Sequence, residues 1–116
     1  MHVPAKGITQ RVVTLIEVKL DTAQVPWPAT AYFYRTSAGA EIDLVIERPD
    51  RSIWAIEIKR GLSAKLERGF FIACEDLKPV RRFVVHARED RYPVTKEVEA
   101  IGLRELTELL RAQETA

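Results

Sequence analysis

The chain has 116 residues, of which 47% are hydrophobic and 30% are charged. That length suits one domain spanning residues 1–116, and the hydrophobic fraction argues against wholesale disorder because it can bury a core. The 18 lysines and arginines nearly balance the 17 acidic residues, and the formal net charge of +1 argues against a polybasic, histone-like binder. A local basic stripe on a neutral protein can still contact nucleic acid.

Cysteine content and hydropathy indicate the compartment. The single cysteine, Cys74, cannot form an intrachain disulfide, and there is no paired-cysteine zinc signature. No apolar run approaches the roughly 18 residues of a membrane span, and residues 1–7 lack the apolar stretch of a secretory signal. We therefore expect a soluble, cytoplasmic protein that does not bind a membrane.

Residues 1–30 are the most ambiguous part of the chain. Thr9 can cap a helix whose apolar face is drawn from residues 8–20, but the same residues also alternate as a β-branched strand does. Both interpretations stay open. Residues 21–30 contain Pro26-Trp27-Pro28, which neither a helix nor a central strand accepts, and are predicted to be a connection.

The next segments predict three strands in a meander. Residues 32–36 are aromatic, and residues 41–47 and 53–59 alternate between two faces. Turn-forming residues separate them at 37–39 and 49–51.

A helix is predicted from a cap at Ser63 to about Leu77, ended by Pro79. Strands at 82–86 and 98–101, a helix at 103–110 and a polar tail at 111–116 follow. The fold class is α/β, with a mixed central sheet flanked by helices and a core over residues 31–110. The helix is expected to bury one stripe: Leu66, Phe70, Ala73, Cys74 and Leu77.

The second and third strands carry the most informative pattern. If the turn between them is tight, antiparallel partners have numbers that sum to 100, so Asp43 faces Glu57 and Glu41 faces Lys59. The same register matches apolar residues on the other face: Ile42 with Ile58, Leu44 with Ile56 and Ile46 with Trp54.

Opposed carboxylates repel each other, so the Asp43–Glu57 pair needs a physical explanation. A hard divalent cation supplies one, because Mg²⁺ is commonly held by one or two carboxylates together with waters and substrate phosphate. Lys59 points to the same face and can reach the same phosphate. Glu41 either pairs with Lys59 or assists at the metal. The alternative for the whole group is a solvated face with cross-strand ion pairs.

Lys59, Arg60, Lys65 and Arg68 cluster around the end of the third strand and the start of the following helix. They can contact a DNA backbone, since phosphate contacts supply most non-specific affinity. The alternative is an ordinary solvated helix face.

At this point the chain resembles a known family. Residues 39–45 (GAEIDLV) followed by 55–59 (AIEIK) resemble the PD-(D/E)XK nuclease superfamily, and with residues 32–36 (YFYRT) they resemble the DUF4143-type domain found behind AAA-type ATPases. The resemblance implies a restriction-endonuclease-like αβββαβ core, metal ligands at Asp43 and Glu57 and a catalytic lysine at Lys59. The superfamily often has an acidic residue on the first helix, for which Glu17 is the candidate.

The leading hypothesis is therefore a DNA phosphodiesterase that depends on Mg²⁺ or Mn²⁺, which makes the chain a candidate endonuclease. The alternative is a catalytically inactive module of the same fold that binds DNA or a partner protein, including an ATPase domain or a second copy of the chain.

Overall fold

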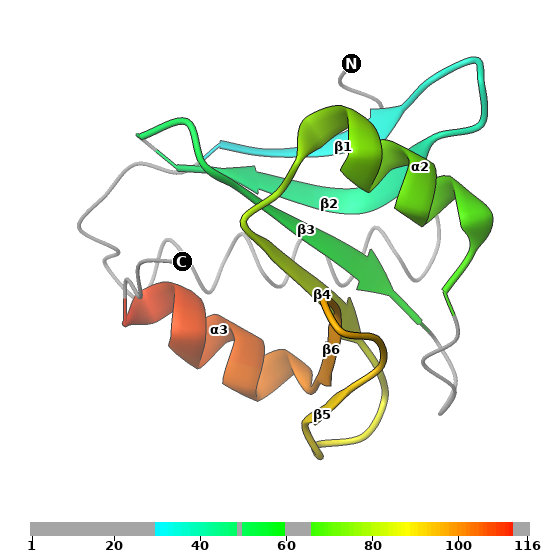
Figure 1. The fold of residues 1–116 in the computed structure, drawn as a ribbon. Coiled ribbons are helices and arrows are strands. Elements are labelled where there is room, and N and C mark those ends of the chain that lie inside the picture. The colour runs from blue at the N-terminus through cyan, green and yellow to red at the C-terminus, as the bar shows by residue number, and fades with distance from the viewer. Residues whose placement is uncertain (1–29, 49, 60–65, 113–116) are drawn as a thin grey trace.

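The computed structural model of the chain describes residues 30–48, 50–59 and 66–112. Six strands form one mixed sheet in the order β1-β2-β3-β4-β6-β5, and α2 and α3 cover opposite faces of it (Figure 1). This confirms the predicted mixed α/β class. The elements are β1 (Thr30–Arg35), β2 (Glu41–Glu47), β3 (Ile53–Ile58), α2 (Arg68–Leu77), β4 (Arg81–Val85), β5 (Tyr92–Pro93), β6 (Glu99–Ile101) and α3 (Leu103–Arg111).

The strand directions follow from how the strands are connected. β1, β2 and β3 form the predicted antiparallel meander, whereas β3, β4 and β6 run parallel to one another. Parallel neighbours need a long crossover, and α2 lies in the crossover from β3 to β4. The short β5 was not predicted, because two residues that include a proline carry no alternation signal. The segment at 8–20 and residues 21–29 of the predicted connection lie outside the described residues.

The start of α2 differs from the prediction. The helix begins at Arg68 with Glu67 at its N-cap, not at a cap on Ser63, which lies outside the described residues. A capping signal is local, whereas the first turn of this helix also packs closely against the turn between β1 and β2. Of the predicted buried stripe, Phe70, Ala73 and Cys74 are buried against the sheet, which confirms its centre. The two ends of the stripe, Leu66 and Leu77, are partly buried against the same core.

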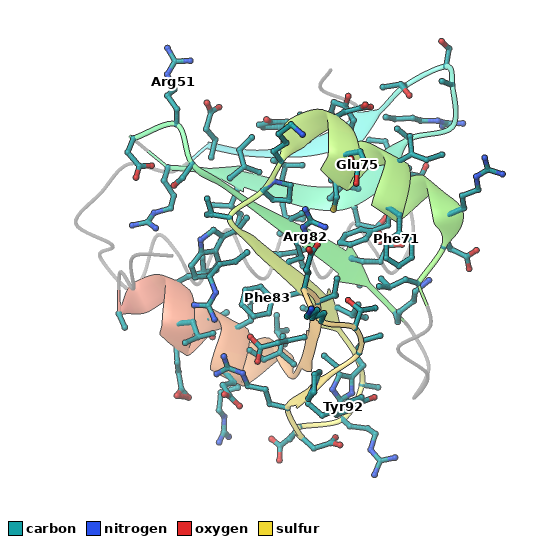
Figure 2. All side chains as sticks on the ribbon, viewed as in Figure 1. Arg51, Phe71, Glu75, Arg82, Phe83 and Tyr92 are labelled. Carbon is teal, nitrogen blue, oxygen red and sulfur yellow. The ribbon has the colours of Figure 1, made fainter. Side chains whose placement is uncertain are left out.

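Each face of the sheet has its own hydrophobic core. On one face Phe83 extends from β4 towards α3 (Figure 2), and its ring centroid lies 5.5 Å from that of Trp54. The α3-side core consists of Leu44, Ile46, Trp54, Ile56, Ile58, Phe83, Val85, Ile101, Leu106 and Leu110. The α2-side core consists of Ala40, Ile42, Val45, Ala55, Phe70, Ala73, Cys74, Val84, Val98 and Ala100.

The predicted register of β2 and β3 is confirmed. Partners sum to 100 along the pair, including Leu44 opposite Ile56. The turn is closed by the Arg48 backbone N–H, which donates to the Ser52 carbonyl at 2.9 Å. Arg51 takes a left-handed conformation there, with φ of 74°.

A β-bulge lies in β2 on its other side, where it pairs with β1. Tyr32 faces Val45 and Tyr34 faces Ile42, so the two residues 43–44 oppose a single residue of β1. Such an insertion bends the strand and redirects its side chains.

The bulge corrects one part of the predicted hairpin. Ile42 packs in the α2-side core, while Leu44 and Ile58 pack in the α3-side core. The predicted contact of Ile42 with Ile58 on a shared face is therefore wrong. Strict alternation assumes one residue per position, and the bulge inserts an additional residue between Ile42 and Leu44.

The far edge of the sheet is held by charged hydrogen bonds. Arg91 donates from Nε to Glu99 at 2.8 Å and from a terminal nitrogen to Glu105 at 2.8 Å. This arginine therefore links the β5–β6 edge to the first turn of α3, and its two carboxylate partners raise its pKa.

The first turn of α2 lies very close to the turn between β1 and β2. A Cβ on Gly69 would meet the Gly39 carbonyl oxygen at 2.5 Å, a distance that requires the backbone to shift. Gly39 itself has φ of 93°, which glycine adopts readily. Glycine at position 69 thus allows α2 to start directly beside β2.

We predict that Gly69→Ala destabilises the protein by about 1–3 kcal/mol, because the added methyl group overpacks this contact. Urea denaturation measures the change. Arg68→Ala, at the neighbouring exposed position, is the control and is expected to change stability by less than about 0.5 kcal/mol. Equal stabilities of the Gly69→Ala variant and the wild type would contradict the close approach.

Candidate functional site

The structure brings Asp43 to the place where β2 and β3 stop pairing. The backbone ladder ends at Leu44 and Ile56, and the next interaction comes from a side chain: the Ile58 backbone N–H donates to Asp43 Oδ2 at 2.9 Å. Continuing the register by one pair places Asp43 opposite Glu57. The bulge at residues 43–44 is what directs this carboxylate towards β3.

Glu57 is a buried carboxyl group. Only 7% of the residue is exposed, and its Oε1 atom is buried without a hydrogen-bond partner. Burial, followed by the negative charge of Asp43, raises the pKa of Glu57 to about 8, although the Lys59 ammonium partly opposes the shift. Removing a carboxylate from water disfavours its charged form, and a neighbouring like charge acts in the same direction.

Lys59 follows directly after β3. Its backbone N–H donates to the Val85 carbonyl at 2.9 Å, which continues the pairing of β3 with β4. Its ammonium lies 3.8 Å from Glu57 Oε2 and 3.7 Å from Glu67 Oε1. The three residues Asp43, Glu57 and Lys59, predicted to form one site, are therefore neighbours in space.

This group of side chains fits a divalent cation. Two carboxylates lie together, and one of their oxygens is buried without a partner, which is costly unless an ion or a proton compensates. Among residues 30–48, 50–59 and 66–112, no group of three or more His, Cys, Asp or Glu side chains gathers as a metal cluster. Water would supply the remaining ligands of such a cation, as is usual for Mg²⁺.

Glu41 lies apart from the Asp43–Glu57 pair. It is exposed at the start of β2, with Oε1 4.0 Å from Arg35 Nε on β1. The ion pair with Lys59, one of the two roles predicted for Glu41, is not formed in the described part of the chain, where the partners of Lys59 are Glu57 and Glu67. The bulge at residues 43–44 separates Glu41 from the part of β2 that pairs with β3.

The other predicted residues are divided between the described and undescribed parts of the chain. Arg68 is exposed at the first position of α2. Glu17, Arg60 and Lys65 lie outside the described residues.

Glu67 is a residue that the sequence analysis did not select for the site. It contacts Lys59 from the N-cap of α2, although eight positions separate the two along the chain. Only the crossover path brings them together, so no motif could have revealed the contact.

His86 is buried directly after β4, and its side chain hydrogen-bonds to the backbone of the loop that follows. Its Nδ1 accepts from the Arg88 backbone N–H at 3.1 Å, and its Nε2 lies 2.9 Å from the Asp90 carbonyl. Both ring nitrogens are thus engaged with backbone, which supports a structural role.

Comparison with known proteins places this arrangement in a family. Residues 22–106 match the family described as "Domain of unknown function (DUF4143)". The chain belongs to the DUF4143 family. The matched region includes Asp43, Glu57 and Lys59.

This DUF4143 chain has relatives in mycobacteria. It is 34% identical over 74 residues to the uncharacterized protein Rv2008c of Mycobacterium tuberculosis and, to the same extent, to the uncharacterized protein Mb2031c of Mycobacterium bovis. Each alignment covers 64% of this chain and 17% of the relative. No solved structure matches the chain. In its described part, no helix is long and apolar enough to span a membrane.

We predict that Glu57→Gln stabilises the metal-free protein increasingly as pH rises from about 4.5 to about 8. Between these pH values the folded state keeps a proton on Glu57, whereas the unfolded state, with its ordinary pKa of 4.5, has released it. The free energy of unfolding of the wild type therefore falls as pH rises through this window. The gain should reach at least about 1 kcal/mol at the upper end. Urea denaturation in EDTA at several pH values measures it.

Glu75→Gln, on the exposed side of α2, is the matched control and should leave the pH profile of stability unchanged. If the free energy of unfolding depends on pH in the same way for the wild type and Glu57→Gln, the pKa of Glu57 is not raised in the folded protein.

Proposed function

We propose that this DUF4143 chain is a metal-dependent phosphodiesterase of the PD-(D/E)XK type that acts on DNA. The observation that carries the proposal is the buried Glu57 carboxyl group, which has an unpartnered oxygen, a second carboxylate beside it and a lysine ammonium 3.8 Å away. A second carboxylate next to the buried Glu57 lowers the stability of the fold, so a purely structural role does not explain the Asp43–Glu57 pair.

The order of elements supports a restriction-endonuclease-like fold. A three-stranded antiparallel meander is followed by a helix and then by a strand parallel to the third strand, which is the βββαβ portion of the implied αβββαβ core. Asp43 and Glu57 lie on the second and third strands of that meander, and Lys59 directly follows the third strand. The resemblance implies site residues at these positions.

Asp43 and Glu57 would hold Mg²⁺ or Mn²⁺, which supplies Lewis acidity towards a phosphoryl oxygen and lowers the pKa of water. Asp43 is oriented for this role by the Ile58 N–H, which fixes one of its oxygens. Lys59 presents a positive charge at the same place, where it would stabilise negative charge on the phosphate. Glu57 would lose its proton on binding the metal, so binding should strengthen as pH rises.

DNA is the proposed substrate because the Lys59 ammonium lies in the site and the sequence predicts a basic group near it. Arg68 is exposed at the first position of α2, directly after Glu67, which contacts Lys59. Arg60 and Lys65 belong to this basic group by sequence alone and lie outside the described residues. Such residues supply non-specific affinity for the backbone. Because the chain spans 17% of the relatives it matches, an associated ATPase domain, another partner protein or a second copy of the chain belongs to the proposal as a partner.

One observation favours a second candidate function, an inactive DNA- or protein-binding module. Within the described ranges the site holds two carboxylates rather than a cluster of three or more acidic or metal-binding side chains. A module that kept the fold but lost a ligand would bind DNA without cutting it.

We predict that Asp43→Ala and Lys59→Ala each reduce divalent-dependent nicking of supercoiled plasmid by about a hundredfold or more, since each removes a group that acts on the reacting phosphate. Gel electrophoresis of plasmid incubated with Mg²⁺ or Mn²⁺ measures the rate. Glu41→Ala, at the acid paired with Arg35, distinguishes an auxiliary ligand from an exposed charge.

Circular dichroism of each variant checks that it is folded, and calorimetry with Mn²⁺ tests the metal site separately. Loss of Mn²⁺ binding in Asp43→Ala supports the site. Nicking that persists in both Asp43→Ala and Lys59→Ala would overturn the proposed activity, and DNA binding without nicking by the wild type would favour the inactive module.

A further inference from the structure

We propose that the Glu67 carboxylate pairs with the Lys59 ammonium at the position where a phosphate of the DNA backbone binds in the complex with substrate. Glu67 is thereby a residue that weakens substrate binding and is displaced by it. This inference rests on the proposed function, because it takes Lys59 to be the phosphate-binding group of the site.

The Lys59 ammonium lies between two carboxylates of different character. Glu57 Oε2, at 3.8 Å, belongs to a side chain that is 9% exposed, and Glu67 Oε1, at 3.7 Å, belongs to one that is 72% exposed. A cation bound by Asp43 and Glu57 would draw the Glu57 carboxylate to itself. Glu67 then remains as the exchangeable anion on Lys59.

The exposure of Glu67 makes the exchange feasible. An ion pair open to solvent at 3.7 Å is weak and is screened by salt. A phosphodiester that also contacts a bound metal ion has a second attachment, so it can replace this carboxylate. The side chain of Lys59 is 20% exposed, so solvent and a ligand can reach part of it.

The position of Glu67 does not depend on its ion pair. Glu67 is the N-cap of α2 but makes no side-chain capping hydrogen bond, and Gly69 in the first turn of α2 packs closely against the backbone at Gly39. Neutralising Glu67 should therefore leave the helix and the sheet in place. The charge can be tested without disturbing the fold.

The consequence for binding has a definite sign. Removing the Glu67 charge frees Lys59 for phosphate, so Glu67→Gln should bind DNA more tightly than the wild type by about two- to fivefold, the range expected for one exposed ion pair. Glu75→Gln, on the exposed side of the same helix (Figure 2), changes the net charge equally and should leave the affinity unchanged.

The experiment measures fluorescence anisotropy of a short labelled DNA duplex with Ca²⁺ in place of Mg²⁺, at low and moderate salt. The variants are wild type, Glu67→Gln, Glu75→Gln, Lys59→Ala and the double variant Lys59→Ala/Glu67→Gln. The double-mutant cycle isolates the coupling of the two residues. The gain from Glu67→Gln is expected to disappear when Lys59 is absent.

Three results would overturn the inference. If Glu67→Gln raises DNA affinity equally in the Lys59→Ala background, or if Glu75→Gln raises it by the same factor, the effect is one of general charge. If Glu67→Gln binds DNA more weakly than the wild type, Glu67 instead positions Lys59. Absence of DNA binding by every variant would also overturn it. Calorimetry with Mn²⁺ on the same wild-type preparation then shows separately whether the Asp43–Glu57 metal site of the proposed function stands.

Discussion

The antiparallel pairing of β2 with β3 positions everything else in this domain. Its register puts Leu44 against Ile56 and Ile46 against Trp54 in the α3-side core, and the continuation of the same register brings Asp43 to Glu57. A slip of one residue would move the apolar set to the wrong face of each strand. The apolar matches thus hold the two acids together, because the energy gained by the core exceeds the repulsion between the carboxylates.

The site lies where this regular pairing ends. The bulge in β2 redirects Asp43, whose carboxylate accepts the Ile58 N–H at a point where the backbone ladder has stopped. Glu57 then remains buried, with an oxygen that has no partner and a pKa of about 8. Such a group lowers the stability of the folded protein. In the proposed function a cation would replace the proton on Glu57, so the local instability and the proposed affinity for a cation would have the same physical origin.

The two faces of the sheet have different roles. The α3 side is an apolar core whose far edge is held by Arg91 with Glu99 and Glu105. The α2 side carries smaller side chains and Gly69, so that the helix can approach the sheet closely and present Glu67 to Lys59. Each face thus has its own hydrophobic core, and the Lys59–Glu67 ion pair lies where α2 begins.

Much of this domain follows from its sequence. Alternation with period two predicts β2 and β3 to within one residue, and the apolar partners across the hairpin predict their register and the meeting of Asp43 with Glu57. The helical stripe of α2 is predicted for the same reason, since periodicity records which side chains are buried. Tertiary structure alone decided the bulge that separates Ile42 from Leu44, the start of α2 at Arg68 and the contact of Glu67 with Lys59. These features depend on close approaches between segments distant in sequence, and a local pattern holds no information about such distances.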